Sequence, residues 1–215
     1  MPDFHLMREN MVKCQVIPAN VTHPELIKAL LTVPREKFVP RQFARIAYMD
    51  APLMLGSGRA LLKPTAFARL FEAATLLPGD AILYIGEGVG YGPALLGRMG
   101  LSVTVIVRKE EETTLTLEGL NMASVAIVTG NPLKGWVKGG AYDKIFLEGC
   151  IEFLPQTLTE QLKEGGEVLC FLSCKRGGCH AVKYVKKGET LTFSPLFDAW
   201  APSLKDFLQQ KSFVF

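Results

Sequence analysis

The sequence has no apolar run that approaches the roughly 20 residues of a membrane-spanning helix. Its N-terminal residues, MPDFHLMREN, also lack the apolar centre of a secretory signal peptide. Neither sign of charge dominates, since the formal net charge of the 215 residues is only +3. Such a weak and evenly spread charge does not favour nucleic acid as a partner. We therefore expect a soluble, cytoplasmic protein that binds neither membranes nor nucleic acid.

The sequence also lacks a CxxC pair, the usual signature of a structural zinc site. Its five cysteines are odd in number and irregularly spaced, which is typical of free thiols in a reducing compartment. Cys170, Cys174, Cys179 and His180 do gather in one short stretch. Without a CxxC pair, we interpret this stretch as a strand end followed by a hairpin turn, and we predict no metal site.

Low-complexity tracts and internal repeats are absent as well. The composition, 48% hydrophobic and 21% charged, is typical of a folded globular chain. A length of 215 residues fits one compact domain with a small appendage. We expect residues 1–78 to form a helical N-terminal region with a substrate-side loop, and residues 79–215 to form the core.

The first third of the chain favours helices. The segment THPELIKALLTV predicts a helix over residues 22–33, with Thr22 as its N-cap and Pro24 in its first turn. The segment PTAFARLFEAATLL predicts an amphipathic helix over residues 64–77, ended by Pro78.

From Ala81 onward, short apolar strands alternate with helical segments. The predicted strands are 81–85, 102–107, 124–130, 143–149 and 167–172, and the predicted helices are 91–100, 109–122 and 154–166. Continuous apolar strands between helices indicate a parallel sheet covered on both faces. Residues 180–197 alternate instead and predict an antiparallel hairpin. The fold class is therefore α/β, a Rossmann-like, doubly wound and mostly parallel sheet with a C-terminal antiparallel hairpin.

The stretch ILYIGEGVGY predicts a ligand-binding turn after the first of these strands. Gly86, Gly88 and Gly90 let a ligand approach the backbone closely, and ligands of doubly wound sheets lie beyond the carboxyl ends of the strands. Dinucleotide sites show GxGxxG. The tighter spacing here, with Tyr91 next, is commoner in folds that hold S-adenosylmethionine. A tight turn without a ligand is the alternative.

The acidic residues that usually accompany such a turn are missing. Tyr84 stands near the turn where an acid is usual, and the second strand ends in Val107, Arg108 and Lys109. A carboxylate at the end of the second strand normally accepts the hydroxyl protons of a ribose. Basic residues in that place keep an NADP-dependent enzyme open as an alternative, although the glycine spacing counts against it.

Four blocks of the chain resemble the protein-L-isoaspartate O-methyltransferase family, over roughly the first four-fifths of the sequence. They are LLTVPREKFVP, AYMDAPLMLGSGRALLKP, LLPGDAILYIGEGVGYGPALL and YDKIFLEGCIEFLPQTLTEQLKEGG. Their order and spacing make the resemblance specific, and the GRALLKP form is similar to a divergent bacterial branch. The resemblance implies a class I methyltransferase fold, S-adenosylmethionine as cofactor, and methyl transfer to the α-carboxyl of an isoaspartyl residue, a protein-repair reaction on a protein or peptide substrate.

The departures from the family pattern fall at its polar positions. Leu62 stands where the family has its catalytic serine, and Arg59 and Lys63 stand where it has glutamines. The resemblance assigns these three residues to the substrate side, and no catalytic residue is predicted. Because leucine offers a carboxylate neither a donor nor a charge, we expect weak or absent methylation of isoaspartyl peptides.

The resemblance also assigns the cofactor-binding residues Gly86, Glu87, Gly88, Gly90, Tyr91, Val107, Asn131, Pro132 and Glu148. Val107 replaces a ribose-binding glutamate in this set. A lost charged hydrogen bond weakens binding by about 1.5–3 kcal/mol, or roughly ten- to a hundredfold. A catalytically inactive binding or scaffolding protein is therefore the other open alternative. The sequence does not predict the oligomeric state.

Overall fold

The computed structural model describes residues 2–56, 59–86, 90–108, 123–174 and 178–209. The predicted helix over 109–122 lies outside the described residues, as do the predicted site residues Glu87 and Gly88. The α-helices are α1 Phe4–Met11, α2 Pro24–Thr32, α3 Pro64–Glu72, α4 Tyr91–Arg98 and α5 Gln156–Thr159. Shorter π or 3₁₀ segments are η1 Val12–Val16, η2 Ile17–Ala19, η3 Arg35–Phe38, η4 Arg41–Ile46, η6 Pro132–Lys134, η7 Val137–Gly139 and η8 Lys205–Phe207. The strands are β1 Leu53–Gly56, β2 Arg59–Leu61, β3 Ala81–Gly86, β4 Ser102–Val107, β5 Val125–Thr129, β6 Tyr142–Ile151, β7 Leu162–Ser173, β8 Cys179–Lys187 and β9 Thr190–Ala199.

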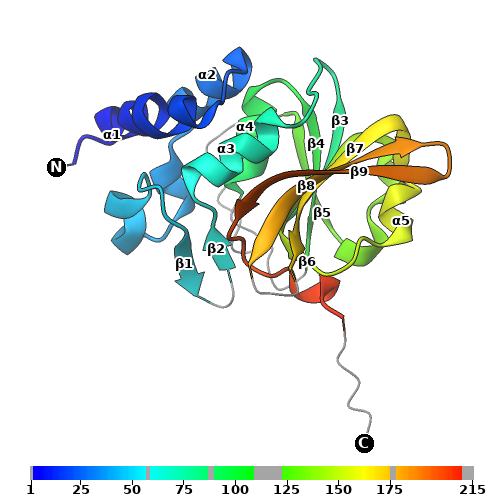
Figure 1. Cartoon of the computed structure of the whole chain (residues 1–215). Helices are drawn as coiled ribbons and strands as arrows, with labels where there is room; N and C mark the ends of the chain where they lie inside the picture. The colour runs from blue at the N-terminus through cyan, green and yellow to red at the C-terminus, as the bar shows by residue number, and fades with distance from the viewer. Residues whose placement is uncertain (1, 57–58, 87–89, 109–122, 175–177, 210–215) are drawn as a thin grey trace, which may run out of the picture.

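Seven strands form one sheet in the order β5-β4-β3-β6-β7-β8-β9 (Figure 1). Strands β3 to β7 run parallel, and β8 and β9 add an antiparallel hairpin at one edge. The chain starts the sheet at β3, builds outward through β4 and β5, and then returns to the other side of β3 with β6. The predicted doubly wound fold with a C-terminal hairpin is confirmed, and the order of strands reverses between β3 and β6.

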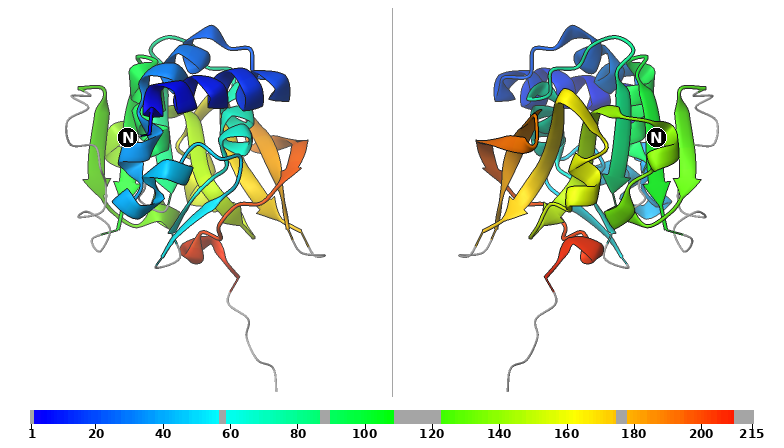
Figure 2. Two further views of the ribbon diagram at one scale, coloured as in Figure 1. Left: turned by 90° about the vertical axis from the view of Figure 1, so that its left-hand side faces the viewer. Right: turned by 90° about the vertical axis from the view of Figure 1, so that its right-hand side faces the viewer.

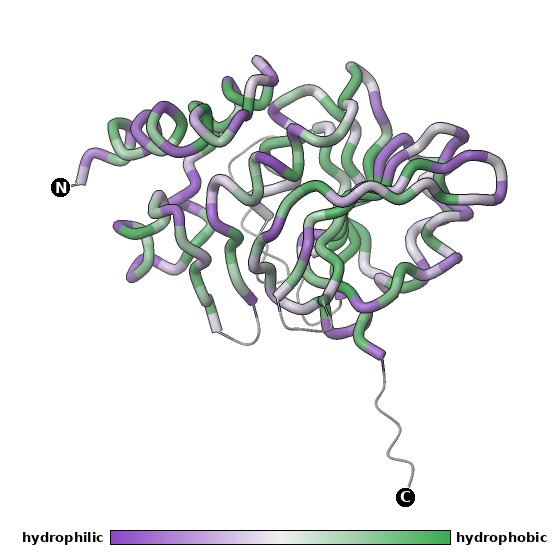
Figure 3. The backbone as a smooth tube through the Cα atoms, in the orientation of Figure 1, coloured by the Kyte–Doolittle hydropathy of each residue, from purple (hydrophilic) through white to green (hydrophobic). Residues whose placement is uncertain are grey.

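The two faces of the sheet carry separate apolar clusters. Strand β3 shows the division, because Ile82 and Tyr84 belong to one cluster while Leu83 and Ile85 belong to the other. The larger cluster also takes in residues of the N-terminal segment and of α3 and α4. In Figure 3 the central strands are mainly apolar along their length, whereas α1 and the tip of the β8–β9 hairpin are mixed. The predicted division of the chain at residue 78 stays a prediction, and the larger cluster contains residues from both sides of it.

The N-terminal helices pack against the outside of α3 and α4, and the chain that follows them reaches the carboxyl ends of the parallel strands. Figure 2 shows α1 and α2 at one end of the molecule, with the β1–β2 hairpin and η8 at the other. A salt bridge connects α1 to η3, because Arg8 Nη2 lies 3.3 Å from Glu36 Oε1. Tyr48 joins them by accepting from Arg8 Nε at 3.0 Å and donating to Glu36.

Three predicted helix boundaries are wrong. Helix α2 is capped by His23, whose Nδ1 accepts from the N–H of Leu26, while Thr22 donates to Glu72 at 2.7 Å instead. Helix α3 ends at Glu72, short of the predicted residue 77. Helix α5 is a single turn, because strand β7 begins at Leu162, which pairs with Tyr142 of β6, and the pairing resumes at Glu167. Sheet pairing overrides the helical pattern of residues 154–166 in this last case.

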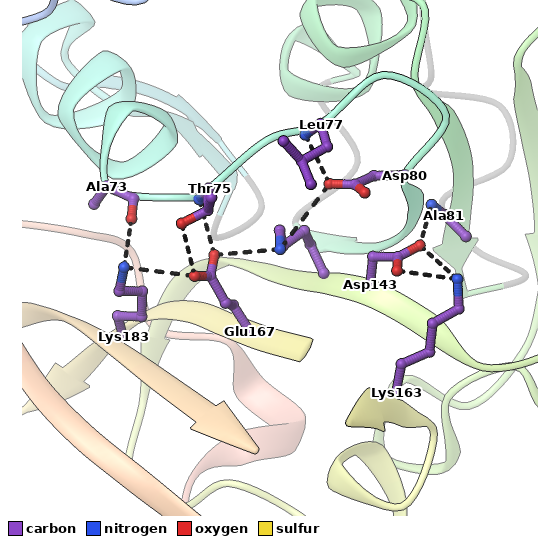
Figure 4. Close-up of polar contacts among 10 residues, drawn as sticks. Ala73, Thr75, Leu77, Asp80, Ala81, Asp143, Lys163, Glu167 and Lys183 are labelled. Atoms are coloured by element: carbon purple, nitrogen blue, oxygen red, sulfur yellow. Dashed lines mark hydrogen bonds and ion pairs between the residues drawn. The ribbon is translucent and has the colours of Figure 1, made fainter. Parts of the chain in front are cut away.

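A cluster of buried charges ties α3 to the amino ends of the strands (Figure 4). Glu167 on β7 accepts from the N–H of Thr75 at 2.9 Å and from its hydroxyl at 3.0 Å. Its carboxylate also lies 3.6 Å from Lys144 Nζ and 3.5 Å from Lys183 Nζ. Lys144 is buried as well, and its other acidic neighbour is Asp80, 4.0 Å away. Each charged side chain of this cluster therefore has a partner of opposite sign within the protein.

We predict that Glu167→Gln lowers the free energy of unfolding by about 3 kcal/mol, because it leaves buried Lys144 without its nearer counter-charge. The measurement is urea unfolding followed by circular dichroism. Glu160→Gln is the matched control, since Glu160 is exposed and bonds only to exposed Gln156 among the described contacts. The control should change the unfolding free energy by less than about 0.5 kcal/mol. Equal losses in the two variants would contradict the role given to the buried cluster.

Candidate functional site

The candidate site lies at the carboxyl edge of the sheet, where the strand order reverses. Gly86 ends β3 and is the register partner of Glu148 on β6. Val107 ends β4 and pairs with Thr129, the last residue of β5. Predicted cofactor residues from separate blocks of the sequence are therefore brought to one edge, which is where doubly wound sheets bind ligands.

A buried carboxylate occupies the middle of this edge. Glu148 is only 5% exposed, and its Oε2 accepts a hydrogen bond from the Tyr84 hydroxyl at 2.5 Å. The pKa of Tyr84 is raised well above its ordinary value by burial, by the charge of Glu148 and by this hydrogen bond. Tyr84 therefore remains a hydroxyl that donates to the carboxylate at neutral pH.

Two glycines provide the room for this pair. A Cβ at Gly92 would lie 1.9 Å from the Tyr84 hydroxyl oxygen, which is an impossible contact. A Cβ at Gly86 would lie 3.2 Å from both Cβ and Oε2 of Glu148. Gly90 has a positive φ of 83° and caps α4, a left-handed conformation that glycine adopts without strain. The glycines of this turn thus serve the buried pair as well as any ligand.

A buried arginine approaches the same place from the N-terminal segment. Arg35, on η3, is fully buried, and its Nε donates to the carbonyl oxygen of Ala47 at 2.7 Å. Its Nη2 donates to the carbonyl oxygen of Leu62. The guanidinium carbon lies 4.9 Å from the centre of the Tyr91 ring. Arg35 therefore connects the segment that carries the substrate-side residues with the first residue of α4.

The charge of Arg35 is not fully used by these contacts. Among the described residues, Arg35 Nη1 and the Tyr91 hydroxyl are both buried without a hydrogen-bond partner of good geometry. Burial lowers the pKa of Arg35, and attraction to Tyr91 and Glu148 opposes this shift. Arginine stays charged in proteins, so the guanidinium carries a buried positive charge at this edge.

The predicted substrate-side residues differ in their surroundings. Leu62 is fully buried in the apolar cluster, and its carbonyl oxygen accepts a hydrogen bond from Arg35 Nη2. Lys63 Nζ lies 3.7 Å from a carboxylate oxygen of Asp50, which also accepts from Thr65 at the start of α3. Arg59 opens β2 and is half-buried. The lysine charge thus has an internal partner, and the leucine side chain faces the core.

The residues predicted to contact the nucleoside lie further along the edge. Val107 is buried, and its carbonyl oxygen accepts from the N–H of Gly130 at 3.0 Å. Asn131 is exposed, and its Oδ1 accepts from the N–H of Leu133 at 2.9 Å, while Pro132 is buried beside it. Arg108 forms an ion pair with Asp206. The arginine considered for a ribose phosphate is therefore engaged with the C-terminal segment.

Sequence reasoning missed two members of this site. Arg35 lies within the quoted block LLTVPREKFVP, but an arginine between prolines gives no indication that it is buried against Tyr91. Tyr84 was noted only as a missing acid. A signal was available in the sequence. The acid usual near the end of β3 is replaced by Tyr84, while β6, the neighbouring strand, carries the acid Glu148 in register with Gly86.

The sheet order, with Gly86 at the point where the order reverses and the acid Glu148 beside it, defines a class I methyltransferase-type fold. Solved structures agree: one protein-L-isoaspartate O-methyltransferase structure matches with a TM-score of 0.80 and 25% identity, over 91% of this chain and 65% of that one. A Plasmodium falciparum protein described by the same activity, in complex with S-adenosyl-L-homocysteine, matches with a TM-score of 0.75 and 20% identity, over 95% of this chain and 99% of that one.

The family follows from sequence comparison. The model of the protein-L-isoaspartate(D-aspartate) O-methyltransferase family matches residues 7–194. A protein-L-isoaspartate O-methyltransferase of Methylorubrum extorquens is 32% identical over 203 residues, covering 91% of this chain and 88% of the relative. One of Pelotomaculum thermopropionicum is 33% identical over 175 residues, covering 79% and 75%. The chain belongs to the protein-L-isoaspartate(D-aspartate) O-methyltransferase family.

Two further observations concern the cysteines and the helices. All five cysteines are free thiols, as the sequence predicts. Within the described residues, no helix is long and apolar enough to cross a membrane.

We predict that Gly92→Ala destabilises the protein by about 1–3 kcal/mol through overpacking against Tyr84. Alanine otherwise favours a helix over glycine by about 1 kcal/mol, so the sign of the effect identifies the clash. The measurement is a double-mutant cycle of unfolding free energies with Tyr84→Leu, which removes the phenol. Gly92→Ala should be tolerated in that background, and the same loss in both backgrounds would show that Tyr84 is not what Gly92 accommodates.

Proposed function

We propose that this protein is an S-adenosylmethionine-dependent methyltransferase that acts on a carboxylate of a protein or peptide, with the isoaspartyl residue as the acceptor to test first. Membership of the isoaspartyl methyltransferase family supports the reaction type. The observation that supports the cofactor assignment is the buried carboxylate of Glu148, which is the register partner of Gly86 at the carboxyl edge and is bonded to Tyr84. Arg35 Nη1 and the Tyr91 hydroxyl, buried near each other, have no hydrogen-bond partner of good geometry among the described residues. Buried polar atoms of this kind fit a ligand that carries charges of both signs.

We assign the cofactor to the carboxyl edge, against Gly86, Glu87, Gly88, Gly90 and Tyr91 at the turn. In this assignment Val107 lies beside the ribose, Asn131 and Pro132 lie near the adenine, and Glu148 lies at the amino-acid end. Val107 offers no acceptor to the ribose, so affinity depends on the other contacts. A cofactor held with one contact missing is expected to bind about ten- to a hundredfold more weakly than in relatives that have the glutamate.

When bound, S-adenosylmethionine supplies an electrophilic methyl group, and its transfer depends mainly on how the acceptor oxygen is positioned. The protein's contribution is therefore to orient the two reactants and to keep water away. Arg35 suits this task, because one side chain holds the backbone of Leu62 on the substrate side and lies against Tyr91 on the cofactor side. No residue is required to act as a nucleophile or as a base, since a carboxylate acceptor is already ionised at neutral pH.

The residues on the substrate side determine the expected rate of methyl transfer. Leu62 lacks the hydroxyl of the family serine, and its side chain is buried. An acceptor carboxylate entering this side loses hydration without gaining a hydrogen bond from residue 62. We therefore assign the acceptor contact to Arg59 and Lys63, although Lys63 must leave Asp50 to make it. A binding protein without turnover is the second candidate, and the same buried leucine favours it. For either candidate we propose a cytoplasmic location, which suits the free thiols.

We predict that methyl transfer to an isoaspartyl peptide has a kcat/KM about ten- to a hundredfold below that of a family enzyme with the serine motif, because one hydrogen bond to a charged group is missing. The measurement is transfer of labelled methyl groups from S-adenosylmethionine, with an aspartyl peptide of the same sequence as the control acceptor. Calorimetric titration with S-adenosylhomocysteine accompanies it. Binding without transfer would support the binding-protein candidate, comparable turnover in the two enzymes would refute the role given to Leu62, and absence of binding would refute the proposed function.

A further inference from the structure

We propose that the C-terminal strap, which we define as residues 200–209, holds together the segments of the cofactor side, and that Asp206 is its positioning residue. The family model matches residues 7–194 and ends before the strap begins. The strap contacts the ends of β4 and β6 and also η6, and each of these segments carries or adjoins a predicted cofactor residue. The identity of the ligand rests on the proposed function.

The strap pairs with β6 on the side of β3. Strand β3 pairs with β6 as far as Gly86 and Glu148. Two residues later, the N–H of Cys150 donates to the carbonyl oxygen of Pro202 at 2.7 Å, and its carbonyl oxygen accepts from the N–H of Leu204 at 2.9 Å. Each strand of a sheet has two neighbours, and β7 is the other neighbour of β6. The strap therefore occupies, beyond Gly86, the row of the sheet that β3 fills up to that residue.

Two apolar side chains anchor the strap in the protein. Leu204 and Phe207 are 3% and 1% exposed, and both belong to the smaller apolar cluster. The carbonyl oxygen of Phe207 also accepts from the N–H of Glu152 at 3.0 Å, just beyond the end of β6. A Cβ at Gly149 would lie 2.6 Å from Cγ of Leu204, so this glycine leaves the space into which the strap packs. The strap thus supports β6 directly after Glu148.

Asp206 connects the strap to the end of β4. Its carboxylate forms an ion pair with Arg108, which follows Val107, the last residue of β4. The side chains of Asp206 and Arg108 are 33% and 24% exposed, so solvent shields the pair only in part. Segment η8, which contains Asp206, lies beyond the end of β6 (Figure 1) and also contacts η6, the segment that follows Asn131. The strap therefore links β4 and η6 to β6.

These links matter because a ligand that contacts several segments binds best when their relative positions are fixed beforehand. Glu148, Val107 and Asn131 come from or follow three different strands, and each lies next to a contact of the strap. Without the ion pair, the end of β4 loses its connection through the strap to β6, and the ligand has to order these segments on binding. Asp206 is assigned no contact with the ligand, because it acts through Arg108.

The test is calorimetric titration of the full chain with S-adenosylhomocysteine and with 5′-methylthioadenosine, which keeps the nucleoside and carries no charge. Asp206→Asn should raise the Kd of both ligands about three- to tenfold, since a partly exposed ion pair contributes modestly. Asp206→Glu keeps the charge and should restore most of the affinity. Arg108→Gln breaks the same pair from β4 and should raise both Kd values similarly. Adding Asp206→Asn to Arg108→Gln should have little further effect, because the two residues act as a pair.

Salt provides a readout that a general loss of stability would not reproduce. Because 5′-methylthioadenosine is uncharged, a weakening of its binding by salt reports on charges within the protein. Raising sodium chloride from about 0.05 to about 0.5 M should raise its Kd for the wild type, since salt screens the partly exposed pair. The same change should leave the Kd of Asp206→Asn nearly constant.

Thermodynamic linkage provides a second readout. If the strap stabilises the ligand-bound state, the ligand stabilises the strap by the same free energy. S-Adenosylhomocysteine should therefore slow hydrogen exchange at the amides of Cys150, Glu152 and Leu204, which bond between the strap and the end of β6. The slowing should be smaller in Asp206→Asn.

Two controls separate the ion pair from charge changes elsewhere on the surface. Asp198→Asn makes the same chemical change at an exposed carboxylate, whose described partner is His180 on β8. Lys205→Gln changes the charge of the exposed residue beside Asp206. Neither control should alter the Kd of either ligand, and the thermal unfolding midpoints of all variants should stay close to that of the wild type.

The outcomes distinguish this inference from the proposed function. If the wild type binds and Asp206→Asn binds equally well, the inference is wrong and the proposed function stands. A loss that Asp206→Glu does not restore, or one that persists in full in the Arg108→Gln background, would show that Asp206 does not act through the pair. Unchanged exchange at the strap amides on binding would also refute the inference. A wild type that binds neither ligand would refute the proposed function, and the inference with it.

Discussion

The buried carboxylate of Glu148 is the constraint on which the rest of the site depends. It is the register partner of Gly86 at the end of β3, and a carboxylate buried in this position requires partners for its charge and its lone pairs. Tyr84 supplies a hydroxyl from the neighbouring strand, and the phenol fills space that only a glycine at position 92 leaves open. Arg35 is buried on η3 of the N-terminal segment, and the charge of Glu148 raises the pKa of its guanidinium against the effect of burial. One acidic side chain thus accounts for the tyrosine and the glycine around it.

Buried polar and charged groups are compensated to different degrees at the two ends of the sheet. At the amino ends of the strands, Glu167 has Thr75, Lys144 and Lys183 as partners, so its charge is compensated within the protein. At the carboxyl ends, Arg35 Nη1 and the Tyr91 hydroxyl have no hydrogen-bond partner of good geometry among the described residues. Satisfied buried charges fix one structure, whereas unsatisfied ones raise the energy of the free protein and are relieved by a ligand. The contrast assigns stability to one end of the sheet and binding to the other.

The sequence predicted the fold well, because continuous apolar strands separated by helices leave few arrangements other than a doubly wound parallel sheet. It failed where distant contacts decide local structure. Residues 162–166 have a helical pattern but open strand β7, where Leu162 pairs with Tyr142 of β6. The cap of α2 is His23, because Thr22 donates to Glu72 instead.

The candidate site was predictable in part. Gly86 and Glu148 came from motif positions, and their adjacency in register follows from parallel pairing of β3 and β6. Arg35 was not predictable, because its burial depends on the carbonyls of Ala47 and Leu62, which come together only in the folded chain. Leu62 shows the same limit, since the sequence identified it as a lost serine and gave no sign that its side chain lies in the core.

The central claim is that the carboxyl edge of the sheet holds an adenosyl cofactor, with its amino-acid end beside Glu148. The most direct measurement is a crystal structure of the protein with S-adenosylhomocysteine. The account predicts the ligand against Gly86, with its ammonium at about 2.7–2.9 Å from a carboxylate oxygen of Glu148, an ordinary separation for a charged hydrogen bond. A ligand bound elsewhere, or one whose amino-acid end is directed away from Glu148, would contradict the account.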